Sequence, residues 1–129
     1  MKRVTGIGGV FIKAKNPDLL RAWYQKHLGI DIQAWGGTTF RWHTPDQPNL
    51  NGSTTWSIFP ATSTYFAPSD ATFMINYRVE NLLALLDLLR EEGCDVNPKI
   101  EHSEYGKFGW VMDPEGNKIE LWEPPDNPI

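Results

Sequence analysis

Asn16-Pro-Asp-Leu-Leu-Arg21 opens a helical pattern that closes at Leu28-Gly29-Ile30-Asp31-Ile32, and the chain repeats this pattern further on. The second copy opens at Asn81-Leu-Leu-Ala-Leu-Leu86 and closes at Glu92-Gly93-Cys94-Asp95-Val96. The two closing glycines stand 64 positions apart. A repeat of this size indicates a duplicated half-domain rather than a solenoid. We therefore expect two similar modules around a shared space, which is where such folds hold a ligand.

The composition is that of one soluble domain. The chain has 129 residues, a formal net charge of −4 and one cysteine, Cys94. We expect a single domain over 1–129, with modules at about 1–66 and 67–129. The basic residues are scattered and no apolar run approaches the roughly 20 residues of a membrane span, so we expect no nucleic-acid or membrane partner. A lone cysteine and the absence of a secretory signal pattern favour a cytoplasmic location.

The first module is expected to have the order βαβββ. Val4–Lys13 is rich in β-branched and aromatic residues, which favours a strand. Asn16 as N-cap, Pro17 at the first helical position and a glycine stop predict a helix over 17–28. Turn-forming residues then separate three short strand candidates. These candidates are Ile32–Trp35, Phe40–His43 and Thr54–Phe59.

The second module repeats that order. Thr72–Val79 alternates apolar and mixed side chains, which predicts a half-buried strand. Asn81 begins a helix over 81–92 that has one leucine stripe and ends at a glycine. A weak strand near Val96–Ile100 follows. The turn Asp113-Pro-Glu-Gly-Asn117 then joins the last two strands, Phe108–Met112 and Lys118–Trp122, into a hairpin.

The ending Trp110-Val-Met-Asp-Pro-Glu-Gly-Asn-Lys-Ile-Glu-Leu-Trp-Glu-Pro124, with Ala22-Trp-Tyr24 on the first helix, resembles the vicinal oxygen chelate superfamily. That superfamily includes glyoxalase I, extradiol dioxygenases and the fosfomycin and bleomycin resistance proteins. The resemblance implies an α+β fold in which curved mixed sheets form a cup and the helices lie outside. It also implies a homodimer. It leaves the reaction open, because this fold hosts isomerisation, ring cleavage, epoxide opening and drug sequestration.

The resemblance further implies four metal-ligand positions, and this chain fills them poorly. The first-strand positions fall at Gly9 and Met74, which are a residue with no side chain and a soft thioether. The last strand of the first module offers only the hydroxyl of Ser57, and Glu120 matches the final glutamate. We therefore expect no metal and no other cofactor. A divalent metal held by a relocated set of two histidines and Glu120 is the alternative; the candidate histidines are His43 and His102.

Glu120 is the candidate catalytic residue. If Ile119 and Leu121 face the helix layer, Glu120 and Lys118 face the cup. There a desolvated carboxylate could act as a general base or as a ligand anchor. The competing interpretation is a solvated carboxylate paired with Lys118 or Arg78.

Aromatic residues on the late strands suit a cavity that stacks a flat or apolar molecule, although each could equally serve core or dimer packing. Lys107, after the hinge-like Gly106, could meet an anionic group. The predicted ligand-binding residues are Trp56, Phe59, Met74, Asn76, Tyr105, Lys107, Trp110 and Trp122. We expect a relative of lyases or isomerases that binds a small organic molecule without the usual metal. A non-catalytic protein that sequesters a drug or metabolite and a metal-dependent lyase or dioxygenase are the alternatives.

Overall fold

The computed structural model describes residues 2–126, which form two helices and one curved sheet of eight strands. The elements of the first module are β1 Val4–Ala14, α1 Pro17–Leu28, β2 Gly37–Arg41 and β3 Ser53–Pro60. Those of the second are β4 Phe73–Val79, α2 Leu82–Glu91, β5 Asp95–Val96, β6 Glu101–Ser103, β7 Gly106–Met112 and β8 Lys118–Glu123. No helix in the described range is long and apolar enough to cross a bilayer.

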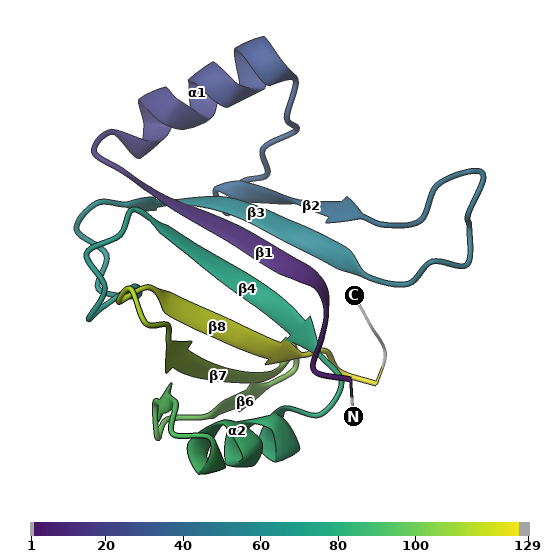
Figure 1. Cartoon of the computed structure of the whole chain (residues 1–129). Coiled ribbons are helices and arrows are strands. Elements are labelled where there is room, and N and C mark those ends of the chain that lie inside the picture. Colours follow the sequence, from purple (N-terminus) through teal and green to yellow (C-terminus); the bar gives the residue numbers. More distant parts are fainter. Residues whose placement is uncertain (1, 127–129) are drawn as a thin grey trace.

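The two modules meet along one pair of strands. The strand order is β2-β3-β1-β4-β8-β7-β5, and β6 pairs with β7. β1 and β4 are antiparallel neighbours, so each module contributes its own half of a continuous sheet. In Figure 1 α1 lies beyond β2 and β3 at one end of this sheet, and α2 lies below β6 and β7 at the other. The α+β class and the cup-like sheet expected from the sequence are confirmed.

Each helix buries apolar side chains against its own module. Under α2, Leu82, Leu85 and Leu86 pack against Val111 of β7 and Leu121 of β8. Under α1, a second cluster contains the buried residues Ala14, Trp56 and Ile58, with Leu20 and Tyr24 of the helix packed against it. The outer face of the sheet therefore belongs to the helices, and the opposite face is free to form the cup.

The helix ends form as the capping residues predict. The Asn16 side chain accepts a hydrogen bond from the backbone N–H of Leu19 at 3.1 Å, and Gly29 closes α1 in the left-handed conformation with φ 67°. Asn81 accepts likewise from the N–H of Ala84 at 3.2 Å. Both caps satisfy backbone groups that a helix end leaves without partners. α2 ends one residue earlier than predicted.

Four short segments differ from the prediction. The strand expected over Phe40–His43 runs instead over Gly37–Arg41. Ile32–Trp35 is not a strand, because a tight turn forms there, with Gly36 N–H bonded to the carbonyl of Gln33 and with φ 99° at Gly36. The strand predicted over 96–100 reduces to Asp95–Val96, since Pro98 has no N–H to donate to a neighbouring strand. β6 was not predicted. It pairs with β7 across Glu104 and Tyr105, which the sequence indicated as a loop.

Candidate functional site

Glu120 lies on the inner face of the sheet. On β8 Ile119 and Leu121 pack toward α2, so the alternation of the strand turns Glu120 to the other side. Its side chain is only 2% exposed. β8 is bordered by β4 and β7, so the carboxylate sits near the middle of the second module's strands.

Three donors hold the Glu120 carboxylate. The hydroxyl of Tyr65 and the indole Nε1 of Trp110 both donate to Oε2, the latter at 3.0 Å. The Asn76 Nδ2 donates to Oε1 at 2.7 Å. These donors come from β7, from β4 and from the 61–72 connection between the modules. A carboxylate that accepts three hydrogen bonds is fixed in one orientation.

The competing interpretation of a solvated ion pair is wrong. Arg78 donates to the backbone carbonyl of Asn51 at 3.2 Å and lies over the ring of Trp42. Lys118 donates to the backbone carbonyl of Tyr65 at 2.9 Å. Neither forms an ion pair with Glu120 among the described residues, so the carboxylate is buried and held by neutral donors.

Burial raises the pKa of Glu120 above its ordinary value, while the hydrogen bonds from Tyr65, Asn76 and Trp110 act in the opposite direction. Burial, followed by the charge of Glu120, raises the pKa of Tyr65, so the phenol stays protonated and remains a donor. Burial lowers the pKa of Lys118, and the nearby Glu120 charge opposes that change. Glu120 is thus a carboxylate with a greater tendency to take up a proton than an exposed one.

A row of residues crosses the sheet at this level. Strand register pairs Thr55 with Gly9, Gly9 with Asn76, Asn76 with Glu120, and Glu120 with Trp110. The sequence alignment put Met74 at the level of the candidate site, but Asn76 is the β4 residue that contacts Glu120.

Within the described residues, the Oδ1 of Asn76 is a buried acceptor with no hydrogen-bond partner. Its amide is oriented by Glu120, because only Nδ2 can donate to the carboxylate. Gly8 leaves room for it: a Cβ at that position would collide with Asn76 Oδ1 and stand 2.9 Å from Trp122 Cε3. The small residue on β1 therefore allows the acceptor to sit beside Glu120.

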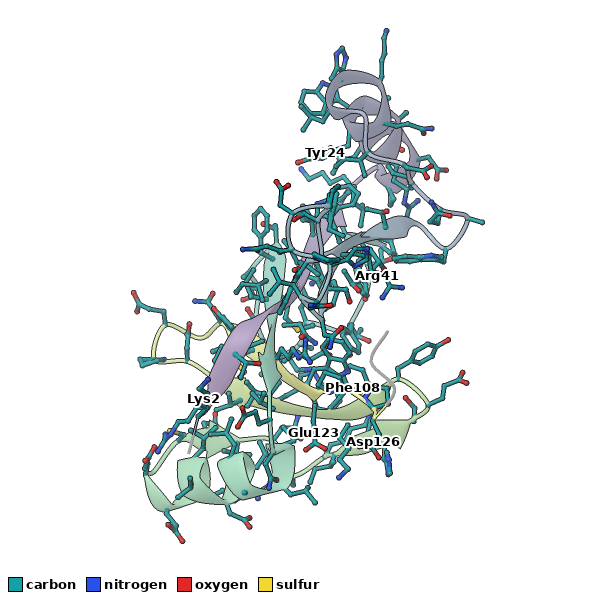
Figure 2. The ribbon with its side chains drawn as sticks, turned by 90° about the vertical axis from the view of Figure 1, so that its right-hand side faces the viewer. Lys2, Tyr24, Arg41, Phe108, Glu123 and Asp126 are labelled. Atoms are coloured by element: carbon teal, nitrogen blue, oxygen red, sulfur yellow. The ribbon has the colours of Figure 1, made fainter. Side chains whose placement is uncertain are left out.

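A cavity of about 500 Å³ opens above Glu120 and Asn76. Its walls are mainly aromatic, with three hydroxyl side chains and Gly8 completing the lining. In Figure 2 the labelled Phe108 belongs to the half of the molecule with α2, while Tyr24 belongs to α1 in the other half. The aromatic wall residues are Phe11, Trp35, Tyr105, Phe108 and Trp122, and the hydroxyl residues are Thr39, Ser53 and Thr55.

Three of the predicted ligand-binding residues, Asn76, Tyr105 and Trp122, line this cavity. The Trp122 Nε1 donates to the Tyr105 carbonyl at 2.7 Å. This bond links the indole of Trp122, on β8, to the loop residue Tyr105 at the mouth of the cavity. Trp110 lies behind Glu120 and acts on the cavity only through it. Whether these residues bind a ligand stays a prediction.

The other four predicted ligand-binding residues are absent from the described lining of this cavity. Trp56 faces α1 and meets the Tyr24 ring at 5.0 Å, because even-numbered positions of β3 point outward. Lys107 also lies away from the cup, with Nζ 3.6 Å from a Glu123 oxygen.

Met74 and Phe59 lie in a neighbouring cluster with Phe66 and Trp110. Neither is among the described residues that line the cavity.

The residues that the prediction missed have weak signals in the sequence. Tyr65 is absent from the predicted site residues, because a loop position gives no information on what its side chain reaches. Phe11 and Thr55 would follow from strand alternation once the register of β1 and β3 is known. Trp35 belongs to the turn that replaced a predicted strand.

The described residues do not fit a divalent metal centre of the four-ligand type. Such a centre needs several donor atoms around one point. Gly9 has no donor, Met74 is packed in the apolar cluster, and the Glu120 oxygens already accept three hydrogen bonds. The relocated set is not formed either, since no three His, Cys, Asp or Glu side chains gather within residues 2–126.

The arrangement of the chain is similar to that of several solved enzymes. Methylmalonyl-CoA epimerase from Mycobacterium tuberculosis superposes with a TM-score of 0.64 at 19% identity, covering 97% of this chain and 91% of that one. A Streptomyces coelicolor methylmalonyl-CoA epimerase in complex with 2-nitronate-propionyl-CoA gives 0.67 at 15% identity, with coverages of 94% and 98%.

A glyoxalase/bleomycin resistance protein/dioxygenase superfamily member from Vibrio splendidus 12B01 gives a TM-score of 0.58 at 12% identity, covering 91% of this chain and 97% of that one. No family model matches the sequence, and no curated protein is similar to it. At these identities the likeness concerns the fold alone. The chain has the vicinal oxygen chelate fold, as its last hairpin indicated.

Proposed function

We propose that the cup binds a small organic molecule and that Glu120 acts on it as a proton acceptor, in a lyase or isomerase type of reaction without a metal. The observation that carries this proposal is the buried carboxylate, with its raised pKa, in the floor of an aromatic cavity of about 500 Å³. That size suits a molecule with one or two rings.

The proposed chemistry needs one open position on the carboxylate. Oε2 of Glu120 accepts from Tyr65 and Trp110, whereas Oε1 accepts only from Asn76 among the described residues. Oε1 therefore keeps a lone pair for a proton from a C–H or O–H group of the ligand. After transfer, Glu120 is a neutral carboxylic acid that can return the proton to another atom of the same molecule. The epimerases with this fold support the proposal by analogy only.

Sequestration without turnover is the second candidate, and the same hydrogen bonds favour it. Three donors stabilise the ionised form of Glu120 and so reduce its basicity. In this case the carboxylate anchors a ligand and no proton moves.

Deuterium exchange separates the two candidates. Binders would first be selected from soluble aromatic fragments by ligand-observed NMR. Each binder would then be incubated in D2O with chelator-treated protein. Exchange of a ligand C–H for deuterium that disappears in Glu120→Gln, while binding persists, supports the proton acceptor. Binding without any exchange supports sequestration, and no binding to the native protein refutes both.

We also propose a cytoplasmic homodimer. No α1 residue is fully buried, and Leu19, Trp23 and Leu28 of that helix are large apolar side chains with at least half of their surface exposed. A second copy of the chain would cover such a surface. Sedimentation velocity at micromolar concentration should show a species of twice 14.7 kDa, and a monomer alone would contradict the proposal.

A further inference from the structure

Glu120 is the one carboxylate in the part of the cavity lining that the structure describes. Lys, Arg and His are absent from the lining formed by the described residues. The nearest cation on the same strand, Lys118, lies over the rings of Tyr65 and Trp110 and lines a separate hollow with Pro68. The carboxylate therefore has no cationic partner on its cavity side.

Most hydrogen-bond donors of the floor are already engaged. The Tyr65 O–H, the Trp110 N–H and one N–H of Asn76 donate to Glu120, and the Trp122 N–H is used by the Tyr105 carbonyl. The unpartnered Asn76 Oδ1, on a side chain that is 3% exposed, adds the negative end of an amide dipole beside the carboxylate. The floor is electrostatically negative over two adjacent side chains.

The walls bring several aromatic rings to the same space. Phe108 and Trp122 are nearly parallel, with an interplanar angle of 17° and ring centroids 6.3 Å apart. Phe11 joins them from β1, and the half-exposed Trp35 and Tyr105 stand at the mouth. The faces of aromatic rings carry partial negative charge and attract cations, most strongly where water is excluded.

From this combination we propose that the ligand of the cup is an organic cation with a flat apolar body, such as an aryl amidine or an arylalkyl amine. The inference rests on the proposed function, because it names the class of molecule that the same cavity takes. A cationic nitrogen would lie near the Glu120 carboxylate, with an N–H group toward the unpartnered Asn76 Oδ1, while the ring stacks on the walls. The open lone pair of Oε1 stays available for proton transfer. A methylmalonyl group carries a carboxylate, so an acyl group of that kind meets like charge in this cavity.

Three ligands of nearly equal shape test the inference. Benzamidine is cationic at pH 7.5, benzamide is neutral and benzoate is anionic. Their dissociation constants are to be measured with the full-length protein by ligand-observed NMR and by tryptophan fluorescence. We expect benzamidine to bind at least tenfold more tightly than benzamide, and benzoate to bind most weakly.

Two variants with the same change in net charge test whether the preference for the cation depends on Glu120. Glu120→Gln should reduce the ratio of benzamide to benzamidine dissociation constants to about one. Glu115→Gln, at an exposed turn position, should leave the ratio unchanged. Circular dichroism and thermal unfolding would show that each variant is folded. If Glu120→Gln does not fold, Phe108→Leu replaces it, and loss of the ring should weaken benzamidine several-fold more than benzamide.

The results distinguish a failure of the inference from a failure of the proposed function. Binding of all three molecules with equal affinity, or with benzoate as the tightest, would overturn the inference and leave small-molecule binding in the cup intact. If none of the three binds at millimolar concentration while another aromatic fragment does, the inference fails and the proposed function stands. If no fragment binds, the proposed function fails with it.

Discussion

Removal of one oxygen atom, in Tyr65→Phe, tests whether the hydrogen bonds to Glu120 stabilise the folded protein. The phenylalanine ring would keep the stacking on Phe59 at 5.7 Å and the edge contact with Trp110 at 6.3 Å. The change therefore removes one of the two donors to Oε2 of Glu120 and leaves the other, Trp110, in place. A hydrogen bond to a charged group contributes about 1.5–3 kcal/mol to the free energy of unfolding. We expect a loss of that size at a pH where the carboxylate is ionised, and a measurement at pH 7 tests for it.

The pH dependence follows from the direction of the Glu120 pKa. Because burial raises that pKa in the folded state, the folded protein holds the proton more tightly than the unfolded chain does. The free energy of unfolding therefore falls as the pH rises from the unfolded pKa, about 4.3, up to the folded pKa. Loss of the Tyr65 donor raises the pKa of Glu120 in the folded state further. The free energy of unfolding should therefore continue to fall up to a higher pH. Near pH 4 Glu120 is largely neutral, so the free energy of unfolding lost in Tyr65→Phe should shrink to about 0.5–1.5 kcal/mol.

Urea unfolding at pH 4 and pH 7, followed by tryptophan fluorescence, measures the loss in free energy of unfolding at each pH. Tyr105→Phe is the matched control, because that half-exposed hydroxyl makes no hydrogen bond among the described residues and its loss should cost less than about 0.5 kcal/mol. An equal loss at both pH values for Tyr65→Phe would refute an ionised Glu120. A loss at pH 7 no larger than that of the control would refute the hydrogen bond itself.

Three further changes examine other parts of the structure. Glu120→Gln should weaken ligand binding without altering metal content, which elemental analysis of undialysed and dialysed protein would check; a stoichiometric ion present only in the native protein would contradict this. Leu86→Ala, in the fully buried contact of α2 with the sheet, should lower the free energy of unfolding by about 2–5 kcal/mol in urea, whereas the half-exposed Leu83→Ala should change it by less than about 1. Gly8→Ala should cost about 1–3 kcal/mol in the same assay, since its Cβ would displace Asn76 Oδ1, and an unchanged stability would show that the floor is not close-packed there.

The sequence was most informative where local chemistry determines structure. The asparagine caps at Asn16 and Asn81 and the turn before β8 depend on neighbouring residues only, and all three form as predicted. The inward direction of Glu120 also followed from the period of a strand whose other face is apolar.

The site was less predictable because it depends on register between strands. Choosing Asn76 over Met74 as the neighbour of Glu120 requires the pairing of β4 with β8, which is set by the packing of the whole sheet. The outward placement of Trp56 and Lys107 has the same origin, since a shift of one residue reverses the side to which a strand residue points. Aromatic content indicated a cavity but could not distinguish a wall from the core.

The position of Tyr65 has a consequence for how such a protein can be recombined. It follows the last strand of the first module, in the 61–72 segment that leads to the second, and it completes the environment of a carboxylate in the second one. A chimaera that unites a foreign amino-terminal half with this carboxy-terminal half would keep all three donors to Glu120 only if the crossover precedes Tyr65, although it would still exchange the cavity walls that the amino-terminal half supplies. The joining segment thus travels with the second half as part of its working unit, and the boundary of the duplicated sequence is not the boundary of the functional one.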